Sequence, residues 1–554
     1  MSLDLPGSTS PMPGRSLARD ASTVAMITAL ARVVGFARWL VFAAAVGAAG
    51  VGTVYQSVNA IPNIVYEIAA GGILAAVVVP LLARLAAEAD RSPEGRGDVD
   101  AVASAILTRT LAALVPVTVV VLLAAPWISA RLLGDLPIEG AVTLGTHLLL
   151  LFTPQILLYG IGVVVTGVLH AHRRFVAAAL APLLSSLVVI ATYVAYGLVV
   201  GANRSVTEVP ATAVWILGLG TTGGVIALSL PLLVAARQAG IRLRPAWALP
   251  TDLVRRATSL AGAGLIALVA QQLAVLVMLK VANRSGGDGA VVVNQYAQTV
   301  YLLPYAVLAV PIATAAFPTL AAGDRTAPSA GETERRTLGS ALAATTALTG
   351  IAAGSLIAAA GAIAAVFAAL DRGREDGAGD ALAAMGPALT AWAPGLIGFG
   401  VAAVATRALY ARGRPLLAGA AVALGWVLSA LIPLLVLAPD EGARPTLVVL
   451  GAASSVGMSI AAALLLMLLA RAWGTEVVRA LALPTLVALL ALGLGAILAS
   501  AIGDRWSTGI GPALGAGLLA GLGVAILPIL LLAWRAPHML GPLRRLLPGR
   551  RGER

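Results

Sequence analysis

Residues 23–46 read TVAMITALARVVGFARWLVFAAAV, a run of 24 residues with only two charges, Arg32 and Arg38. A helix that crosses a bilayer needs roughly 20 predominantly apolar residues, so this stretch is long enough to span a membrane. A charged side chain near the bilayer centre costs at least ~2.5–3.5 kcal/mol, and it persists only where it faces a partner or a water-filled cavity. The stretch therefore predicts a transmembrane helix with one face directed toward other parts of the protein.

Apolar stretches of this kind follow one another along the whole chain of 554 residues. Apolar residues make up 59 % of the sequence and charged residues only 11 %, whereas soluble domains carry about 25 % charged residues. This composition excludes a soluble enzyme, a disordered protein and a nucleic-acid-binding protein, and it predicts an all-α integral membrane protein. We expect fourteen transmembrane helices, near 23–46, 56–83, 102–129, 142–169, 175–200, 211–236, 254–282, 290–320, 337–369, 382–410, 415–438, 446–470, 477–502 and 509–534.

The basic residues support this topology. Of the 37 arginines and lysines, 27 lie in the termini and in alternate loops, seven lie in the intervening loops, and three lie within the spans. Because positively charged loops stay in the cytoplasm, both termini are predicted to be cytoplasmic. The basic C-terminal tail is expected to lie against anionic membrane lipid. The chain has no cysteine, which excludes disulfides, thiol nucleophiles and cysteine zinc sites.

The sequence also contains an internal repeat. Gln56 is followed six positions later by Pro62, and the same pair recurs as Gln298 and Pro304, 242 residues further on. Transporters are often built from two related halves, so we expect two pseudo-symmetric six-helix lobes and two C-terminal helices. The expected divisions are a cytoplasmic tail (1–20), an N-terminal lobe (21–240), a C-terminal lobe (250–473), two further helices (474–535) and a basic cytoplasmic tail (536–554). Both prolines also predict bends in their helices.

Three cations lie within the predicted spans. Arg32 is about ten residues into its helix, near mid-membrane, and Arg38 points about 120° away from it around the helix axis. We expect both to line a cavity, with pairing to Glu67 or capping of a broken helix as the alternatives. The 242-residue shift brings Arg38 onto Lys280 and favours a cavity-lining lysine, but Lys280 could equally reach the interface at the outer end of its span. For Glu67 a role as counter-ion of the arginines is favoured over a proton or sodium site or a packing role.

These charges indicate the class of ligand. A cavity with two or three permanent cations and little acid favours an anion, and the guanidinium fork suits phosphate or pyrophosphate. The sequence has no GxGxxG, no P-loop and no metal-ligand spacing, so we expect no cofactor, no metal and no enzymatic site. Transport would then run on a coupling ion or on the membrane potential.

Several motifs resemble those of the MurJ/MviN family of lipid II flippases. The stretch ARVVGFAR at 31–38 is similar to the family's first helix and is the most specific match. Further matches follow in the family's order, in the second, eighth and tenth helices: NAIPN (59–63) with GGIL (71–74) and VP (79–80), YA (296–297) through FPTL (317–320), and GLIG (395–398) with LYAR (409–412) and Pro415. Together they extend over most of residues 21–420.

The resemblance implies the fold of the MOP exporter superfamily, in which two lobes enclose a cationic cavity and alternate between the faces of the membrane. It implies a transporter rather than an enzyme, in the bacterial inner (cytoplasmic) membrane and functional as a monomer. The implied substrate is lipid II, the undecaprenyl-pyrophosphate-linked peptidoglycan precursor, moved from the inner to the outer leaflet for cell-wall synthesis. The implied substrate-binding residues are Arg32 and Arg38, and Lys280 is added from the repeat. As cavity or gating residues we expect Pro62, Asn63, Glu67, Gln298 and Pro304.

The sequence departs from the best-known members of that family at several positions. Thr53 stands where they carry an aspartate, Tyr66-Glu67 where they carry two arginines, and Gln298-Thr299 where they carry Asp-Arg. The expected cavity is therefore less cationic than theirs, and Lys280 would replace part of the missing charge. The bias toward arginine indicates a GC-rich genome and a divergent branch of the family.

Other functions fit parts of the sequence. The nearest alternative is an exporter of another polyprenyl-linked oligosaccharide; a cationic drug is disfavoured by the positive cavity. A membrane-embedded enzyme acting on polyprenyl phosphates would need clustered acids or histidines, and the acids Asp371, Glu375, Asp376 and Asp380 have no such partners in the sequence. A non-transporting scaffold for cell-wall proteins is disfavoured by the intact intramembrane charges.

Overall fold

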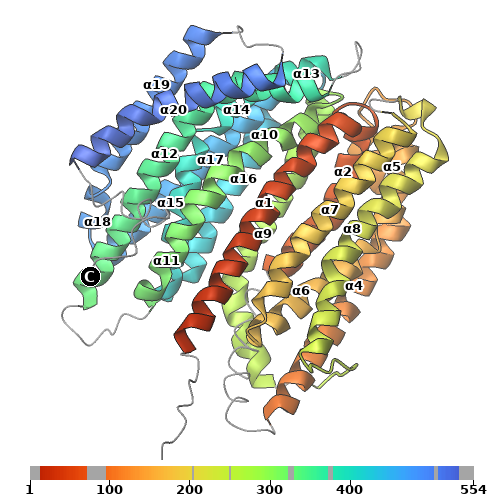
Figure 1. Cartoon of the computed structure of the whole chain (residues 1–554), viewed down its shortest axis with the longest axis horizontal. Coiled ribbons are helices and arrows are strands. Elements are labelled where there is room, and N and C mark those ends of the chain that lie inside the picture. The colour runs from red at the N-terminus through yellow and green to blue at the C-terminus, as the bar shows by residue number, and fades with distance from the viewer. Residues whose placement is uncertain are drawn as a thin grey trace, which may run out of the picture.

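The computed structural model describes residues 13–71, 95–201, 205–248, 251–321, 330–371, 378–503 and 509–535. Within these ranges all regular structure is helical, as the ribbon shows (Figure 1). A segment that crosses the hydrocarbon core must satisfy its own backbone hydrogen bonds, and an α-helix does so within one segment. The predicted all-α fold is confirmed.

The helices of the first part of the chain are α1 (Pro13–Ala45), α2 (Val51–Ile68), α4 (Gly95–Leu133), α5 (Ala141–Phe152), α6 (Gln155–Ala171), α7 (Phe175–Val199), the 3-10 turn η2 (Val206–Glu208) and α8 (Ala211–Gln238). Those of the second part are α9 (Thr251–Gly286), α10 (Ala290–Pro304), the π-helical turn η3 (Tyr305–Ala309), α11 (Val310–Ala321), α12 (Ala330–Leu370), α13 (Gly379–Ala383), α14 (Met385–Trp392), α15 (Gly395–Ala411), α16 (Pro415–Val436), α17 (Ala443–Trp473), α18 (Glu476–Arg479), α19 (Ala482–Ile502) and α20 (Ile510–Arg535).

Within the described residues, 13 helical segments are long and apolar enough to cross a membrane. They coincide with thirteen of the fourteen predicted spans. The remaining span, predicted at 56–83, begins in α2, and its residues from 72 onward lie outside the described ranges. α1 begins at Pro13, so the end of the predicted tail 1–20 is helical, while the tail 536–554 lies outside the described residues. The chain is a multi-pass helical membrane protein.

The internal repeat is visible in the turn after α6 and the turn after α15. Arg173 and Gly413 occupy these turns with φ of 57° and 68°, in the left-handed region. The next residue closes each turn in the same way: the Arg174 N–H donates to the Leu169 carbonyl at 2.8 Å, and the Arg414 N–H donates to the Leu409 carbonyl at 2.9 Å. The two turns therefore occupy equivalent places in the two parts of the chain.

This equivalence corrects the register taken from the sequence. The shift from residue 173 to residue 413 also relates the starts of α6 and α15, at 155 and 395, and those of α7 and α16, at 175 and 415. It is shorter by two positions than the shift from Gln56 to Gln298. α2 and α10 begin at 51 and 290, so the shift between these two helices is 239 positions, one fewer than the 240 that relate the turns. Gln56 therefore corresponds to Gln295 and not to Gln298.

The same correction separates Arg38 from Lys280. The glycines that follow α1 and α9, Gly47 and Gly287, both have positive φ and are related by the shift seen in the turns. Because a helix turns about 100° per residue, an error of two positions changes the face of the helix. Arg38 and Lys280 are therefore not equivalent positions of the repeat.

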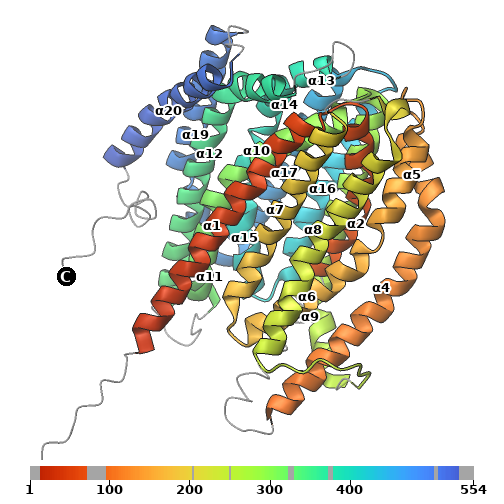
Figure 2. The same cartoon turned by 45° about the vertical axis from the view of Figure 1, so that its right-hand side comes forward.

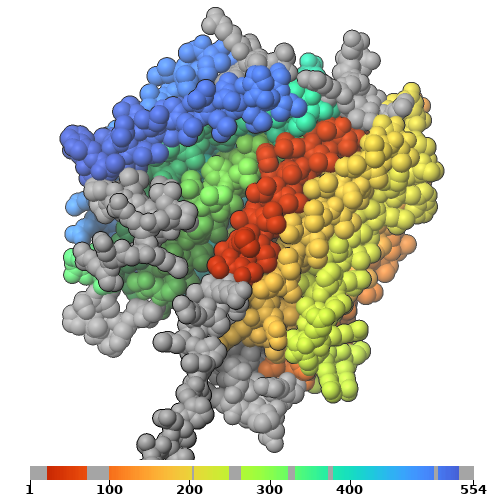
Figure 3. Space-filling view, in the orientation of Figure 1, coloured from red at the N-terminus to blue at the C-terminus, as the bar shows by residue number. Residues whose placement is uncertain are grey.

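α12 forms the link to the two C-terminal helices. It packs against α15 within the second part of the chain and against α19 and α20 on its other side, at the edge of the molecule (Figures 1 and 2). In the space-filling view α20 lies on the surface (Figure 3). The backbones of α12 and α19 touch: a Cβ atom on Gly495 would lie 2.3 Å from the carbonyl oxygen of Gly354. Only glycine permits this approach.

α1 and α2 connect the two parts of the chain. α1 packs along α7 and also touches α12, while α2 packs against α5 and contacts α9 and α10. The cavity described below lies beside these helices. The division into lobes at 21–240 and 250–473 stays a prediction.

Candidate functional site

A cavity of about 790 Å³ lies between α1, α2, α6, α7, α8 and α10. Its polar lining residues are Thr28, Arg32, Arg38, Tyr55, Gln56, Asn59, Asn63, Tyr66, Glu67, Tyr159, Ser185, Ser186, Tyr193, Thr221, Gln295 and Thr299. Along α1 the side chains change from the exposed Arg32, through the half-buried Arg38, to the fully buried Phe42. The cavity is therefore deepest near Phe42 and opens toward the end at which α1 begins.

Arg32 and Arg38 supply the positive charge of this cavity. The guanidinium carbon of Arg38 lies 5.9 Å from the centre of the Trp39 ring, within the range of a cation–π contact. In the described part of the chain neither arginine forms an ion pair with an acid. Two guanidinium groups with free donors in one cavity can hold a phosphate or pyrophosphate through charge-assisted hydrogen bonds.

Glu67 lines the same cavity from α2. Its predicted pairing with Arg32 or Arg38 is not formed, since the described residues contain no ion pair between them. Nor do the described residues gather three or more His, Asp or Glu side chains that could hold a metal ion. Glu67 is thus an unpaired acid in a cationic cavity.

Asn63 lies one turn before Glu67 and also lines the cavity, whereas the neighbouring Pro62 is buried inside α2 and does not. The Asn63 amide donates to the Asn59 carbonyl at 2.8 Å and accepts the Tyr159 hydroxyl at 2.9 Å. The bond from Tyr159 connects α6 to α2 at the cavity wall, and the bond to Asn59 fixes the Asn63 side chain on α2.

α10 presents a different face from the one expected. Gln295 and Thr299, four residues apart and so on one face of the helix, line the cavity, followed by Leu302, Leu303 and Ala306. Gln298 is half-buried and does not line it. Pro304 ends α10, and the backbone continues through the π-helical turn η3, so the predicted irregularity at this proline is present.

Lys280 lies outside the cavity. Its Nζ is 2.5 Å from Oδ2 of Asp135, which lies in the turn between α4 and α5, and both side chains are a third or more exposed. The sequence left two alternatives for Lys280, a place in the cavity wall or a place at the interface near the outer end of its span. The observed position corresponds to the second. The repeat had suggested the other because it was taken two residues out of register.

Aromatic side chains close the deep end of the cavity. Tyr193 packs against Phe42, with ring centroids 5.1 Å apart, and its hydroxyl lies 3.1 Å from that of Tyr55. Tyr296 stacks on Phe367 at 4.6 Å and brings the second part of the chain into the same cluster. Sequence reasoning missed these residues, because they come from different helices and meet only in the folded chain.

Beyond these rings, the buried Asp371 and the half-buried Asp288 connect the linker between α1 and α2 with the second part of the chain. Asp371, just after α12, accepts the backbone N–H of Ala48 at 2.9 Å, and Asp288, between α9 and α10, accepts that of Gly50 at 2.9 Å. Asn283 in α9 donates to the Ser57 hydroxyl at 2.9 Å. We call this region, with Ala48, Gly50, Asp288 and Asp371 at its centre, the closed end.

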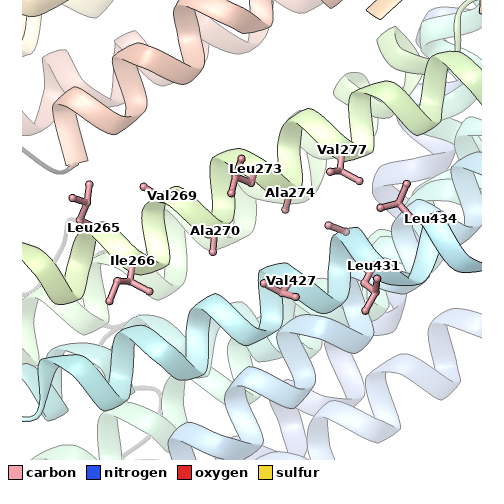
Figure 4. Close-up of a pocket in the computed structure, with 11 residues that line it drawn as sticks. Leu265, Ile266, Val269, Ala270, Leu273, Ala274, Val277, Val427, Leu431 and Leu434 are labelled. Atoms are coloured by element: carbon pink, nitrogen blue, oxygen red, sulfur yellow. The ribbon is translucent and has the colours of Figure 1, made fainter. Parts of the chain in front are cut away.

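A second hollow, a groove of about 540 Å³, lies between α9 and α16 (Figure 4). Its lining is entirely aliphatic: Leu265, Ile266, Val269, Ala270, Leu273, Ala274, Val277, Val427, Ala430, Leu431 and Leu434. It shares no lining residue with the cationic cavity. It offers a surface for apolar chains and no group that could bind an anion.

Comparison with known protein families finds one whose match covers most of this chain. The family described as lipid II flippase MurJ matches residues 42–517, which is most of the chain. The chain belongs to the MurJ family of lipid II flippases. The family resemblance predicted from the sequence is confirmed, and with it a membrane protein of the transporter class.

Individual members of the MurJ family are distant from this chain. The probable lipid II flippase MurJ of Rhizobium tropici is 27 % identical over 311 residues, which cover 55 % of each chain. The lipid II flippase MurJ of Burkholderia cenocepacia is 27 % identical over 310 residues, covering 55 % of this chain and 57 % of that one. The chain thus spans about half the length of the curated relatives that it matches.

Solved structures share the fold. A lipid II flippase MurJ in an inward closed conformation superposes with a TM-score of 0.69 at 16 % identity, covering 92 % of this chain and 98 % of that chain. An inward-facing MATE family transporter of the MOP superfamily gives a TM-score of 0.61 at 16 % identity, covering 83 % of this chain and 98 % of that chain. At this identity the likeness shows the fold alone, which is the predicted MOP fold.

Proposed function

We propose that this chain is a flippase that moves lipid II, the undecaprenyl-pyrophosphate-linked peptidoglycan precursor, from the inner to the outer leaflet of the bacterial inner membrane. The observation that carries the proposal is the pair Arg32 and Arg38, which line one cavity without an acidic partner among the described residues. Membership of the MurJ family supports lipid II as the substrate, because that family is described by this activity.

In this proposal the arginines hold the pyrophosphate. A guanidinium fork binds two phosphate oxygens at once, and the low dielectric of a cavity inside a membrane protein strengthens each contact. The polyprenyl tail stays in the lipid beside the protein, since about 0.8 kcal/mol per CH₂ would oppose its transfer to water. The protein therefore has to supply a path for the charged head only.

The proposed cycle is alternating access between two lobes, 21–240 and 250–473. With both termini in the cytoplasm, as the arginine distribution predicts, the cavity opens to the cytoplasm and the closed end faces outward. Release of the head group then requires the contacts of Asp288 and Asp371 to break. A coupling ion or the membrane potential would drive the cycle, and we propose that a monomer carries it out.

The test is exposure of lipid II in the outer leaflet of cells depleted of their own flippase. Such cells would express the natural chain, Arg32→Ala, Arg38→Ala, or the control Arg131→Ala, which removes an arginine outside the cavity, at matched membrane levels. The proposal expects the natural chain and the control to restore exposure and both cavity variants to lose it. Restoration by all four forms would remove the arginines from the mechanism. No restoration by a well-inserted natural chain would favour another polyprenyl-linked oligosaccharide.

A further inference from the structure

Two tyrosines form an aromatic platform on the wall of the cationic cavity. Tyr66 in α2 and Tyr159 in α6 both line the cavity, and their ring centroids lie 4.5 Å apart at an interplanar angle of 38°. Neither belongs to a hydrophobic core cluster of the described residues, whereas Tyr55 and Tyr193 do. Tyr66 is half-buried and Tyr159 is only 8 % exposed, so a ligand in the cavity meets the pair mainly through the Tyr66 ring.

The platform is held in place by hydrogen bonds. The Tyr159 hydroxyl donates to the Asn63 side-chain oxygen at 2.9 Å, and the Asn63 amide donates to the Asn59 carbonyl at 2.8 Å. Asn63 lies three residues before Tyr66, on the same side of α2. The Tyr159 ring is therefore oriented before any ligand binds, and Tyr66 packs against it, which lowers the entropic cost of binding.

Uncharged hydrogen-bonding groups lie in the same cavity. Gln56 is only 4 % exposed and lines the cavity, yet its side chain makes no hydrogen bond with the described residues. Its counterpart in the repeat, Gln295, lines the cavity from α10 and likewise has no side-chain partner there. An amide that faces a cavity without a protein partner can exchange hydrogen bonds with a ligand that supplies donors and acceptors.

We infer that Tyr66 and Tyr159 form a saccharide subsite, which binds a sugar of the head group attached to the pyrophosphate of the transported lipid. Gln56 lies ten residues before Tyr66, about 15 Å along α2, so it would bond to another part of the same head group. A sugar ring has an apolar face of C–H groups that covers an aromatic ring, and hydroxyl or acetamido groups at its edge that match amide side chains. The inference rests on the proposed function, because the first sugar is bonded directly to the pyrophosphate that Arg32 and Arg38 hold. It adds the recognition of the uncharged part of the head group, which the arginines cannot provide.

The experiment compares two lipids on the purified full chain in lipid nanodiscs: undecaprenyl pyrophosphate, and the same lipid carrying an N-acetylated disaccharide without peptide. The natural chain is expected to bind the glycosylated lipid about tenfold more tightly. Tyr66→Ala should remove most of this preference and leave the dissociation constant for undecaprenyl pyrophosphate unchanged. Tyr66→Phe keeps the ring and should keep the preference, because the Tyr66 hydroxyl has no partner in the described structure.

Two controls separate the possible failures. Arg38→Ala should weaken both lipids equally, and Tyr410→Ala, which removes a tyrosine outside the cavity, should change neither. Equal binding of both lipids by the natural chain, or equal loss of both in a Tyr66→Ala protein with unchanged thermal stability, would overturn the saccharide subsite while the pyrophosphate site stands. Failure of the natural chain to bind either lipid would overturn the proposed function, and the subsite with it.

Discussion

The hydroxyl of Thr53 in α2 donates a hydrogen bond of 2.6 Å to the carboxylate of Asp288, which lies 235 residues further along the chain. The same carboxylate accepts the backbone N–H of Gly50 at 2.9 Å, and the Thr53 oxygen accepts the N–H of Gly289 at 2.9 Å. The first N–H groups of a helix have no partner inside it, and a carboxylate is a strong acceptor for them. Asp288 thus fastens the start of α2 to the turn between α9 and α10.

Asp288→Asn is expected to loosen the closed end. The amide that replaces one carboxylate oxygen lacks the charge and would turn an N–H toward the N–H of Gly50. Hydrogen bonds to charged groups contribute about 1.5–3 kcal/mol, so the open population should rise about tenfold or more. Because the chain has no cysteine, a single Ala49→Cys, at a site only 1 % exposed, can report this opening through its rate of thiol alkylation.

The matched control for that variant is Asp440→Asn. Asp440 carries the same charge, is exposed, and has a φ of 57° that asparagine also tolerates. Its substitution should leave the alkylation rate of Ala49→Cys unchanged. An unchanged rate in Asp288→Asn as well would show that this carboxylate does not hold the closed end together.

A second prediction concerns the stability of the second part of the chain. Arg412, just after α15, lies 2.7 Å from the buried carboxylate of Glu334 and 4.2 Å from the centre of the Trp473 ring, and the Trp473 indole N–H donates to the same carboxylate at 3.1 Å. Arg412→Ala should lower the free energy of unfolding by about 1–3 kcal/mol, below the full cost of breaking a buried pair because Arg412 is itself 34 % exposed. Arg412→Lys should fall in between, since it keeps the charge and loses the planar stack.

Unfolding in detergent by heat or denaturant would measure these differences. Arg336→Ala serves as the control, because its pair with Glu332 is exposed on both sides and is worth little. Equal effects of Arg412→Ala and Arg336→Ala would mean that the contact with Glu334 and Trp473 does not stabilise the fold.

The features that could be predicted from the sequence are those that one continuous segment determines by itself. A transmembrane helix is encoded by about 20 consecutive apolar residues, which is why thirteen spans appear where the hydropathy places them. Arg32 and Arg38 could be singled out for the same reason, because a charge inside a transmembrane segment costs free energy regardless of how that helix packs. Both lie in the cavity.

What could not be predicted depends on the register between segments. The shift taken from the sequence is three residues too long for α2 and α10, so it singled out Gln298 instead of Gln295. It is two residues too long for α1 and α9, so it matched Lys280 to Arg38, although Lys280 pairs with Asp135. The contact between Tyr66 and Tyr159 joins two helices that are distant in the sequence, and no local sequence pattern predicts it. The Asp371 carboxylate meets a backbone N–H, which has no sequence signature at all.

Glu67→Gln is expected to tighten the binding of an anionic head group, if the arginines hold the pyrophosphate as proposed. Glu67 lines the same cavity and repels the ligand's negative charge. Removing that charge should lower the dissociation constant for undecaprenyl pyrophosphate about two- to fivefold, and the gain should shrink as salt is raised. Glu441→Gln, an exposed site outside the cavity, should have no effect. Weaker binding by Glu67→Gln would instead show that this acid positions the arginines.

Cross-linking Lys280 to Asp135 tests whether the closed end opens during transport. The two side chains meet at 2.5 Å between α9 and the α4–α5 turn, and both are exposed enough that replacing them should cost little stability. In the chain carrying Lys280→Cys and Asp135→Cys, a short bifunctional thiol reagent should join the two positions and reduce outer-leaflet exposure of lipid II to the level of cells without the protein. Each single-cysteine variant treated with the same reagent should stay active, and a reducible linker should restore exposure on reduction. Transport that continues in the fully cross-linked protein would mean that the head group leaves by a route that does not separate α9 from the α4–α5 turn, and the alternating-access cycle proposed here would be wrong.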